Sequence, residues 1–319
     1  METTKQLEKA FGPLWELYND QNVREFIVDG PNDIYYEYND GKNREIRNFE
    51  PGLKDASAIK DIILALADLA EKEIKSDTMQ LHFSIGKNSR VSAVLPPMSV
   101  NGPGFNLMKL PNQKVSWNDL VQWNAITNEA SEIIQQMIRE NKNILIGGNI
   151  GSGKTTLANL CVNTINQEER VVTIERVANL VLDRKRLARL EAPNNEKDEM
   201  VELVKASSFM RPDWIILNQF EGPEAMNFIE LLRDGHSGMG VIGASNIFDC
   251  LKRVELKALS SNMGASIDDV RYAIGEAFHY VIFQERMPTG RRVITGIGEV
   301  KYDQGELRCE IVYKFKDTE

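Results

Sequence analysis

One eight-residue segment, from Gly148 to Thr155, restricts the possible folds of this chain more than any other feature. It matches the pattern G-x-x-x-x-G-K-S/T at every fixed position. A short apolar run at Asn143 to Ile146 precedes it, and a helical run begins at Lys154. Glycines let backbone N–H groups curve around phosphate oxygens, and the N-terminus of the following helix adds positive potential. The segment therefore predicts a phosphate-binding P-loop between a strand and a helix of an α/β domain.

Each part of this P-loop has an expected role in holding a nucleoside triphosphate. Lys154 would reach the β- and γ-phosphates, and the hydroxyl group of Thr155 would hold Mg²⁺. ATP and Mg²⁺ are therefore the expected cofactors, although the loop itself does not select the base. The alternative is a glycine-rich turn that binds nothing, but such a turn has no need of lysine and threonine at these two positions. The predicted cofactor-binding residues are Gly148, Gly151, Ser152, Gly153, Lys154, Thr155 and Thr156.

Composition and charge exclude several other classes of protein. The chain has 319 residues and a formal net charge of −9, so binding to nucleic acid is not expected. No stretch approaches the roughly 18 apolar residues that span a bilayer, so no transmembrane segment is predicted. The three cysteines, Cys161, Cys250 and Cys309, are widely spaced. We interpret them as buried thiols in a reducing cytosol, because their spacing fits neither a metal site nor a disulfide framework.

The pattern of secondary structure changes along the chain. Up to about residue 110, apolar spacing predicts two helices, and the runs at 80–84 and 90–95 predict paired strands. From residue 128 onward, short apolar strands alternate with helices, which predicts a largely parallel sheet covered on both faces. We therefore predict an α/β protein with an N-terminal α+β domain at 1–110, a linker at 111–127 and a P-loop domain at 128–319.

The order of further motifs resembles one known family, the secretion (traffic) ATPases of type II and type IV secretion systems and type IV pili. The resemblance extends over roughly residues 20 to 300, and its nearest branch is the CpaF/TadA type of the tight-adherence (Tad) pilus machinery. No single short string is decisive, but their order and spacing together are specific. The strings are Ile27-Val28-Asp29-Gly30-Pro31, Ser89-Arg90-Val91, Leu95-Pro96-Pro97, Thr173-Ile174-Glu175, Met210-Arg211-Pro212-Asp213, Gly222-Pro223-Glu224, Gly235-His236 and Gly290-Arg291-Arg292.

This resemblance implies a RecA-like P-loop domain that assembles into a hexameric ring, with nucleotide held between the two domains. It implies a cytoplasmic protein, peripheral at the inner membrane, that docks on a membrane platform protein. It also implies site roles: Glu175 near Mg²⁺ or the attacking water, Arg90 near the γ-phosphate, and His236 in a switch loop near the phosphates. Gln219 occupies the position of the family's Walker B glutamate.

Several positions depart from the family pattern where chemistry would occur. A neutral amide such as Gln219 can bind a water molecule but cannot take its proton. Glu221 replaces the usual arginine, and Arg176 replaces the carboxylate that usually follows Glu175. Ala244 occupies the place of the second histidine, and Met108-Lys109 stands for an expected arginine-lysine pair. Loss of one positioned catalytic group can cost about 10²–10⁴ in rate.

We therefore predict a protein that binds ATP and takes part in type IV (Tad-like) pilus assembly or secretion, with weak or absent hydrolysis. One alternative is a fully active hexameric motor that uses Glu175 in place of the missing carboxylate. Another is a regulatory subunit, either as a homo-hexamer or in a mixed ring with an active paralogue. A third is a sensor of another nucleotide.

Overall fold

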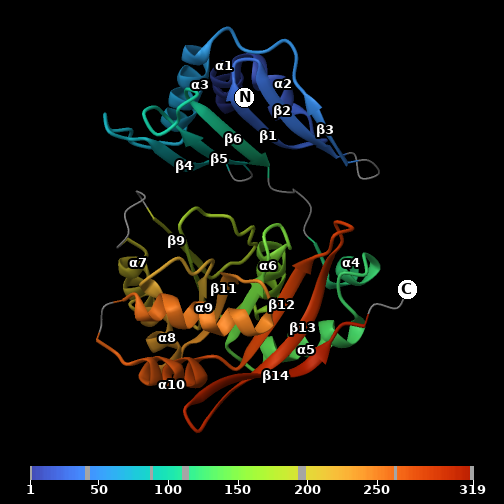
Figure 1. Cartoon of the computed structure of the whole chain (residues 1–319), viewed down its shortest axis with the longest axis vertical. Helices are drawn as coiled ribbons and strands as arrows, with labels where there is room; N and C mark the ends of the chain where they lie inside the picture. Colours follow the sequence, from blue (N-terminus) through green and yellow to red (C-terminus); the bar gives the residue numbers. More distant parts are fainter. Residues whose placement is uncertain are drawn as a thin grey trace. The chain divides into compact units, whose positions relative to one another are not determined.

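The computed structural model describes residues 2–39, 44–86, 89–109, 115–192, 199–261 and 264–316. These residues form two compact units, which divide the chain at residues 114 and 115 (Figure 1). Each unit has its own hydrophobic core. The described helices include none that is both long and apolar enough to cross a membrane.

The first unit is an antiparallel six-stranded sheet with helices that pack against it, as the predicted α+β domain requires. Its strands lie in the order β3-β2-β1-β6-β5-β4, and the predicted pairing of 80–84 with 90–95 is observed between β4 and β5. The core includes Phe11, Phe26 and Ile63. The elements are α1 (Glu2–Phe11), the 3₁₀ helix η1 (Gly12–Leu14), α2 (Trp15–Asn19), β1 (Val23–Gly30), β2 (Asp33–Asn39), β3 (Arg44–Asn48), α3 (Ala56–Leu69), β4 (Gln80–Ile85), β5 (Ser89–Val94) and β6 (Gly104–Lys109).

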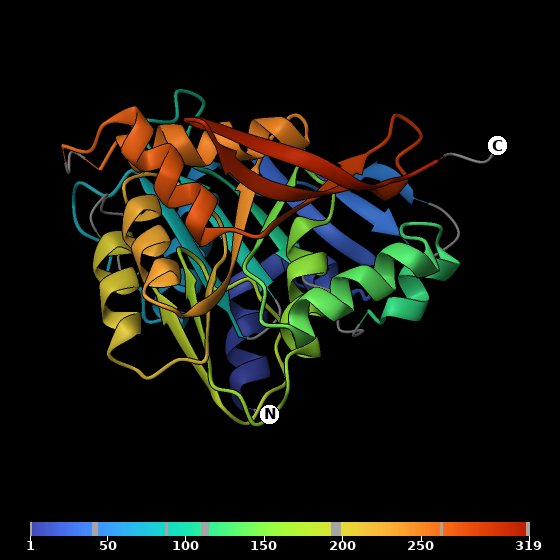
Figure 2. The same ribbon diagram turned by 90° about the horizontal axis from the view of Figure 1, so that it is seen from below.

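The second unit is a sheet of eight strands in the order β14-β13-β12-β7-β11-β10-β8-β9. The pairs from β12 through to β9 are parallel, and β13 and β14 extend the sheet as a long antiparallel hairpin, drawn in red in Figure 2. The strands are β7 (Ile144–Gly148), β8 (Val171–Glu175), β9 (Leu187–Glu191), β10 (Trp214–Leu217), β11 (Ser237–Gly243), β12 (Tyr280–Arg286), β13 (Arg292–Asp303) and β14 (Glu306–Lys314).

Helices cover both faces of this sheet. One buried cluster includes side chains of the helices α7 to α10, and a second cluster on the other face includes those of α4 to α6. The sheet strands divide their side chains accordingly, because neighbouring residues of a strand point to opposite faces. The helices are α4 (Trp117–Gln122), α5 (Asn128–Arg139), α6 (Lys154–Thr164), α7 (Glu199–Ser208), α8 (Glu224–Arg233), α9 (Ile247–Leu259) and α10 (Ile267–Ala277).

The segment 115–127, which the sequence analysis assigned to a linker, packs into the second unit. Leu120, Ala125 and Ile126 are buried in its core. Ser116 begins α4 with a capping box, in which its hydroxyl group accepts from the backbone N–H of Asp119. This capping signal is present in the sequence and marks a short helix where we expected none. Residues 110–114 lie outside the described residues.

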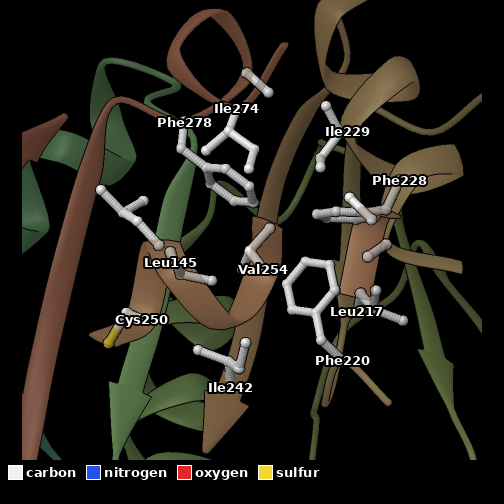
Figure 3. Close-up of a cluster of buried hydrophobic side chains, with 14 of the residues drawn as sticks. Leu145, Leu217, Phe220, Phe228, Ile229, Ile242, Cys250, Val254, Ile274 and Phe278 are labelled. Carbon is white, nitrogen blue, oxygen red and sulfur yellow. The ribbon is translucent and has the colours of Figure 1, made fainter. Parts of the chain in front are cut away.

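Three phenylalanine rings fill the centre of one core cluster, above the parallel strands (Figure 3). The ring centroid of Phe220 lies 5.5 Å from that of Phe228 and 6.3 Å from that of Phe278. Gly240 of β11 allows this contact, because a Cβ atom there would lie 2.3 Å from the ring of Phe220. Phe220 is the third residue after the end of β10, so its burial holds the loop that begins at the carboxyl end of that strand.

The Asn143 side chain joins three parts of the second unit at the amino end of the parallel strands. Its Nδ2 atom donates to the carbonyl of Ala277 at 2.7 Å, and its Oδ1 atom accepts from the N–H of Gly238 at 2.8 Å. The side chain is buried, so both partners depend on it. Unpaired buried backbone groups are costly, since each loses its hydration without a replacement.

Asn143→Leu should therefore lower the free energy of unfolding of the second unit by about 2–4 kcal/mol, from two buried backbone groups left unpaired. Chemical denaturation measures this change. Asn118→Leu, on the exposed side of α4, is the matched control and should change stability little. Equal stability of the two variants would show that Asn143 is not a structural link.

Candidate nucleotide-binding site

The P-loop connects β7 to α6 at the carboxyl edge of the parallel strands, as the sequence predicted. Gly151 and Gly153 have φ angles of 72° and 96°, in the left-handed region that favours glycine. A Cβ atom on Gly148 would lie 2.1 Å from the carbonyl oxygen of Gln284, so only glycine fits there. The three glycines thus meet backbone requirements of this loop and are more than a flexible turn.

The polar groups of the loop fit a phosphate ligand. Lys154 Nζ donates to the carbonyl oxygens of Gly148 at 3.0 Å and Asn149 at 2.8 Å, and burial lowers the pKa of this ammonium group. The Ser152 side chain is fully buried, and its Oγ atom has no hydrogen-bond partner in the described part of the chain. A buried hydroxyl group normally has a partner. An anionic oxygen in the loop would provide one.

Thr155 and Thr156 follow Lys154 in the first turn of α6, and both are half-buried. Their position in the first helical turn is the one from which a hydroxyl group can reach a phosphate-bound Mg²⁺ or a phosphate oxygen. The residues present therefore fit the expected nucleotide and its metal ion. All seven predicted cofactor-binding residues lie within this one loop and the helical turn that follows it.

Three residues that the sequence analysis did not assign to the site also lie against the P-loop. Gln284 and Arg286 are at the end of β12, which pairs with β7 so that Gln284 is opposite Gly148. Arg292 begins β13, and its Nε atom donates to the carbonyl of Gly151 at 2.9 Å. Arg292 was part of the family resemblance but had no assigned role. We missed these residues because the sequence does not show that the strand-like run at His279 pairs with the P-loop strand.

Glu175 ends β8, and both of its carboxylate oxygens are bound within the second unit. Oε2 accepts from the N–H groups of Asn179 at 2.6 Å and Leu180 at 2.9 Å, and from the Asn218 amide at 3.0 Å. Oε1 accepts from the Arg189 guanidinium group at 3.0 Å. The carboxylate has four donors and no exposed surface, so its role in the structure is to hold these four groups together. We call this the anchor role of Glu175.

The sheet order also separates Glu175 from the P-loop. Two strands, β11 and β10, lie between β8 and β7. Neighbouring strands are ~4.8 Å apart, so Glu175 lies on the order of 14 Å from the P-loop strand. The structure therefore does not bring Glu175 and Thr155 together as a metal site within this unit, although the sequence assigned both to one. A sheet order cannot be read from local sequence patterns, which explains the difference.

Gln219 is exposed at the carboxyl end of the sheet, in the loop after β10. Its φ angle is 98°, a strained value for a residue other than glycine. Neighbouring contacts hold this loop: Phe220 donates its N–H to the carbonyl of Val241, and Glu224 accepts from the N–H of Gly222 at 2.9 Å. These contacts hold the loop in place, and it presents an amide where the family resemblance implies a carboxylate.

Two of the departures from the family pattern contact one another. The guanidinium group of Arg176, which follows β8, forms an ion pair with the carboxylate of Glu221 in the loop after β10. Lys257 of α9 adds a hydrogen bond to the carbonyl of Glu221 at 2.8 Å. The family resemblance implies the opposite charges at these two positions. The reversed pair therefore keeps an attraction between the two loops.

His236 lies at the amino end of the parallel strands, whereas the P-loop lies at their carboxyl end. The predicted place of His236 near the phosphates is therefore wrong for this unit. His236 directly precedes β11, which runs parallel to β7 and pairs Gly243 with Gly148. The seven residues of β11 therefore separate His236 from the level of the P-loop by about 20 Å. His236 instead lines a polar cavity of about 500 Å³ together with His279 and Asn143. We had not predicted that a strand begins at Ser237.

Ala244, in contrast, is close to the P-loop. Its N–H donates to the carbonyl of Gly148 at 3.0 Å, and the residue is buried. The position where the family has its second histidine is thus beside the phosphate-binding loop. In this chain it offers only a methyl group, which can neither donate nor accept a proton.

In the first unit, Arg90 lies on β5 and donates to the carbonyl of Ser89 at 3.0 Å. Met108 is its neighbour across the strand pair. Lys109 is bound by the end of α2, where Nζ donates to the carbonyls of Leu17, Tyr18 and Asp20 at 2.9, 2.9 and 2.6 Å. Burial lowers the pKa of Lys109 to about 8. Lys109 therefore has a structural role in this unit.

Comparison with known proteins identifies the family. A family model described as "Type II/IV secretion system protein" matches residues 8–287. The chain belongs to this family. Members of the type II/IV secretion family among curated proteins include a "Probable conjugal transfer protein TrbB" of Sinorhizobium fredii. It is 25% identical over 314 residues, covering 96% of this chain and 92% of the relative. The "Type IV secretion system protein VirB11" of Bartonella henselae is 24% identical, covering 93% and 92%.

Solved structures of the type II/IV secretion family share the fold. The Legionella pneumophila ATPase DotB matches with a TM-score of 0.63 at 17% identity, covering 94% of this chain and 80% of DotB. The pilus retraction motor PilT with bound ADP matches with a TM-score of 0.62 at 17% identity, covering 98% and 83%. The predicted RecA-like P-loop fold with a smaller N-terminal α+β domain is thereby confirmed.

Proposed function

We propose that this protein binds ATP with Mg²⁺ in a type IV secretion or pilus machine and hydrolyses it slowly. The family membership supports a role in such a machine. The P-loop supports binding, because its three glycines, Lys154 and the unpaired hydroxyl group of Ser152 are all in place for a phosphate. Thr155 would hold the metal ion, which would supply charge neutralisation on the phosphates.

One observation carries the proposal of slow hydrolysis: both oxygens of Glu175 are already bound by four donors. Such a carboxylate is a poor partner for the attacking water. Gln219 cannot accept the proton of that water either, and Ala244 offers no polar group beside the P-loop. Binding and hydrolysis therefore depend on different residues here, and only the binding residues are intact.

A second candidate function is an active motor, and the ion pair between Arg176 and Glu221 favours it. Two departures that compensate one another are expected where selection maintains the loop after β10. In such a motor, release of Glu175 by a rearrangement of its four donors would have to precede the chemical step.

The assembly is proposed from the same family membership. We propose a homo-hexamer, or a mixed ring with a paralogous ATPase, that acts in the cytoplasm at the inner membrane on a platform protein. Arg90 of the first unit would then approach the γ-phosphate in the ring. The tight-adherence pilus branch rests on sequence motifs alone and stays a prediction.

Steady-state phosphate release by the purified protein tests the proposed slow hydrolysis. We expect turnover far below ~1 s⁻¹, the lower end of the ordinary enzyme range, at saturating ATP and Mg²⁺. Lys154→Ala, which removes the phosphate-binding cation, is the background control. Turnover near ~1 s⁻¹ or faster that depends on Lys154 would overturn slow hydrolysis and favour the motor.

A further inference from the structure

The hairpin formed by β12 and β13 lies along the P-loop, and it brings two arginines to one side of it. The Asn149 side chain ties the loop to this hairpin: Oδ1 accepts from the N–H of Arg286 at 2.9 Å, and Nδ2 donates to its carbonyl at 3.5 Å. Arg292 binds the carbonyl of Gly151. Hydrogen bonds at Asn149 and at Gly151 therefore join the loop to the hairpin.

The guanidinium groups themselves are close to the loop. The Nη1 atom of Arg286 lies 3.2 Å from the position that a Cβ atom of Gly151 would occupy. The Cδ atom of Arg292 lies 3.4 Å from the corresponding position of Gly153. Because glycine has no side chain, the two arginine side chains can lie directly against the backbone of the P-loop.

This placement concentrates positive charge. Lys154 and the N-terminus of α6 already create a positive potential at the loop, and two guanidinium groups add to it. Positive groups placed around one loop attract an anion to it. Arginine suits such a place because its planar fork can bind two phosphate oxygens at once.

Unpaired buried polar atoms give a second, independent indication of a ligand here. Gln284 is 3% exposed, and its Oε1 atom has no hydrogen-bond partner among the described residues. Its Nε2 atom lies 3.2 Å from the Cβ position of Gly153, so the amide faces the P-loop. The Oγ atom of Ser152 is unpaired in the same region. Both side chains are buried against the loop that would hold the phosphates.

We propose that Arg286 and Arg292 bind phosphate oxygens of the nucleotide from within the same chain, beside Lys154. The inference rests on the proposed function and deepens it, because it adds Arg286 and Arg292 to the residues that bind the phosphates in the same site. On this view Arg292 exchanges its bond to the Gly151 carbonyl for a phosphate oxygen when ligand enters. The ligand class is a nucleoside di- or triphosphate that is recognised by its phosphate chain. The contact is therefore independent of the base.

Isothermal titration calorimetry with ATP, GTP and inorganic tripolyphosphate tests this contact. Arg286→Gln and Arg292→Gln should each weaken the binding of all three ligands about 10-fold or more, the loss expected for one charged hydrogen bond. Arg292→Lys should recover part of the affinity, because it keeps the charge. Arg308→Gln, in the β13–β14 hairpin and paired with Glu306, is the matched control and should bind as the wild type does.

Three outcomes separate the possibilities. If the arginine variants lose affinity for ATP but not for tripolyphosphate, the guanidinium groups contact the base or ribose and the inference is wrong. If the variants bind all three ligands like the wild type, the arginines only shape the loop and the inference is wrong, while the proposed function stands. If the wild type itself binds no nucleotide, the proposed function fails. Thermal unfolding without ligand checks that each variant is folded. If Arg292→Gln does not fold, Arg292→Lys is used in its place to test the contact.

Discussion

Replacing Glu175 with alanine should lower the free energy of unfolding of the second unit by about 3 kcal/mol, as for other buried ion pairs that lose one partner. The loss leaves the N–H groups of Asn179 and Leu180, the Asn218 amide and the Arg189 guanidinium group without their acceptor. The estimate is at the lower end of the usual range, because Arg189 is about one-third exposed and can be hydrated.

Glu191→Ala is the matched control for this experiment. Glu191 is the neighbour of Glu175 across the β8–β9 pair, but its side chain is exposed, so stability should change little. Urea denaturation with and without ATP gives the readout. If Glu175→Ala unfolds like the wild type and yet loses phosphate release, then Glu175 is a catalytic residue and the anchor role assigned to it is wrong.

Restoring a carboxylate at position 219 should have the largest effect on turnover. Gln219→Glu is expected to raise phosphate release by about 100-fold, the lower end of the range for one general base, since Ala244 still lacks a polar group. The loop is held by the buried ring of Phe220, so the new carboxylate should occupy the place of the amide. The measurement is steady-state phosphate release at saturating ATP.

Two controls make this result specific. Gln219→Ala should give no gain, because it supplies no base. The double variant Gln219→Glu with Lys154→Ala should return to background, because the gain requires bound phosphate. Unchanged turnover in Gln219→Glu, with ATP affinity retained, would show that the missing carboxylate does not limit hydrolysis. The slow step would then have to lie elsewhere, for example in the release of Glu175 from its donors.

The sequence predicted those parts of the fold that are set by local patterns. The P-loop, its strand and its helix were predicted closely, because a short apolar run before a complete phosphate-binding motif is distinctive. No ranges were predicted for the strands β11 and β13. Both contain glycines, which weaken the sequence signal of a strand, and Gly240 of β11 leaves room for the neighbouring ring of Phe220.

Local sequence patterns do not show which strands and loops contact each other, and this explains the errors at the site. The position of His236 followed from the family resemblance, but its distance from the phosphates depends on where β11 begins. Two arginines that carry no motif show the same dependence. Arg184 donates to carbonyls at the end of α6, including Val162 at 2.9 Å, and Arg189 pairs with Glu175. Contacts between residues far apart in the chain decide these roles, and no local pattern contains them.

All three cysteines are buried, as the sequence predicted, and each has a free thiol. Burial raises the pKa of Cys161 to about 12 and that of Cys309 to about 11, so their thiolate forms are scarce at neutral pH. They are therefore packing residues. Cys250 contributes directly to the nucleotide site's framework, since its Sγ atom would lie 2.1 Å from a Cβ atom on Gly147 of the P-loop strand.

The ion pair between Arg176 and Glu221 bears on how divergence within a family is measured. A comparison that scores each position separately records two unrelated losses here. A comparison that scores the pair records one exchange of charge between two residues that contact each other. Degeneracy counted by single positions therefore overestimates how far such a protein has drifted from its relatives. Substitutions that occur in contacting partners should be counted once, as a single reciprocal event.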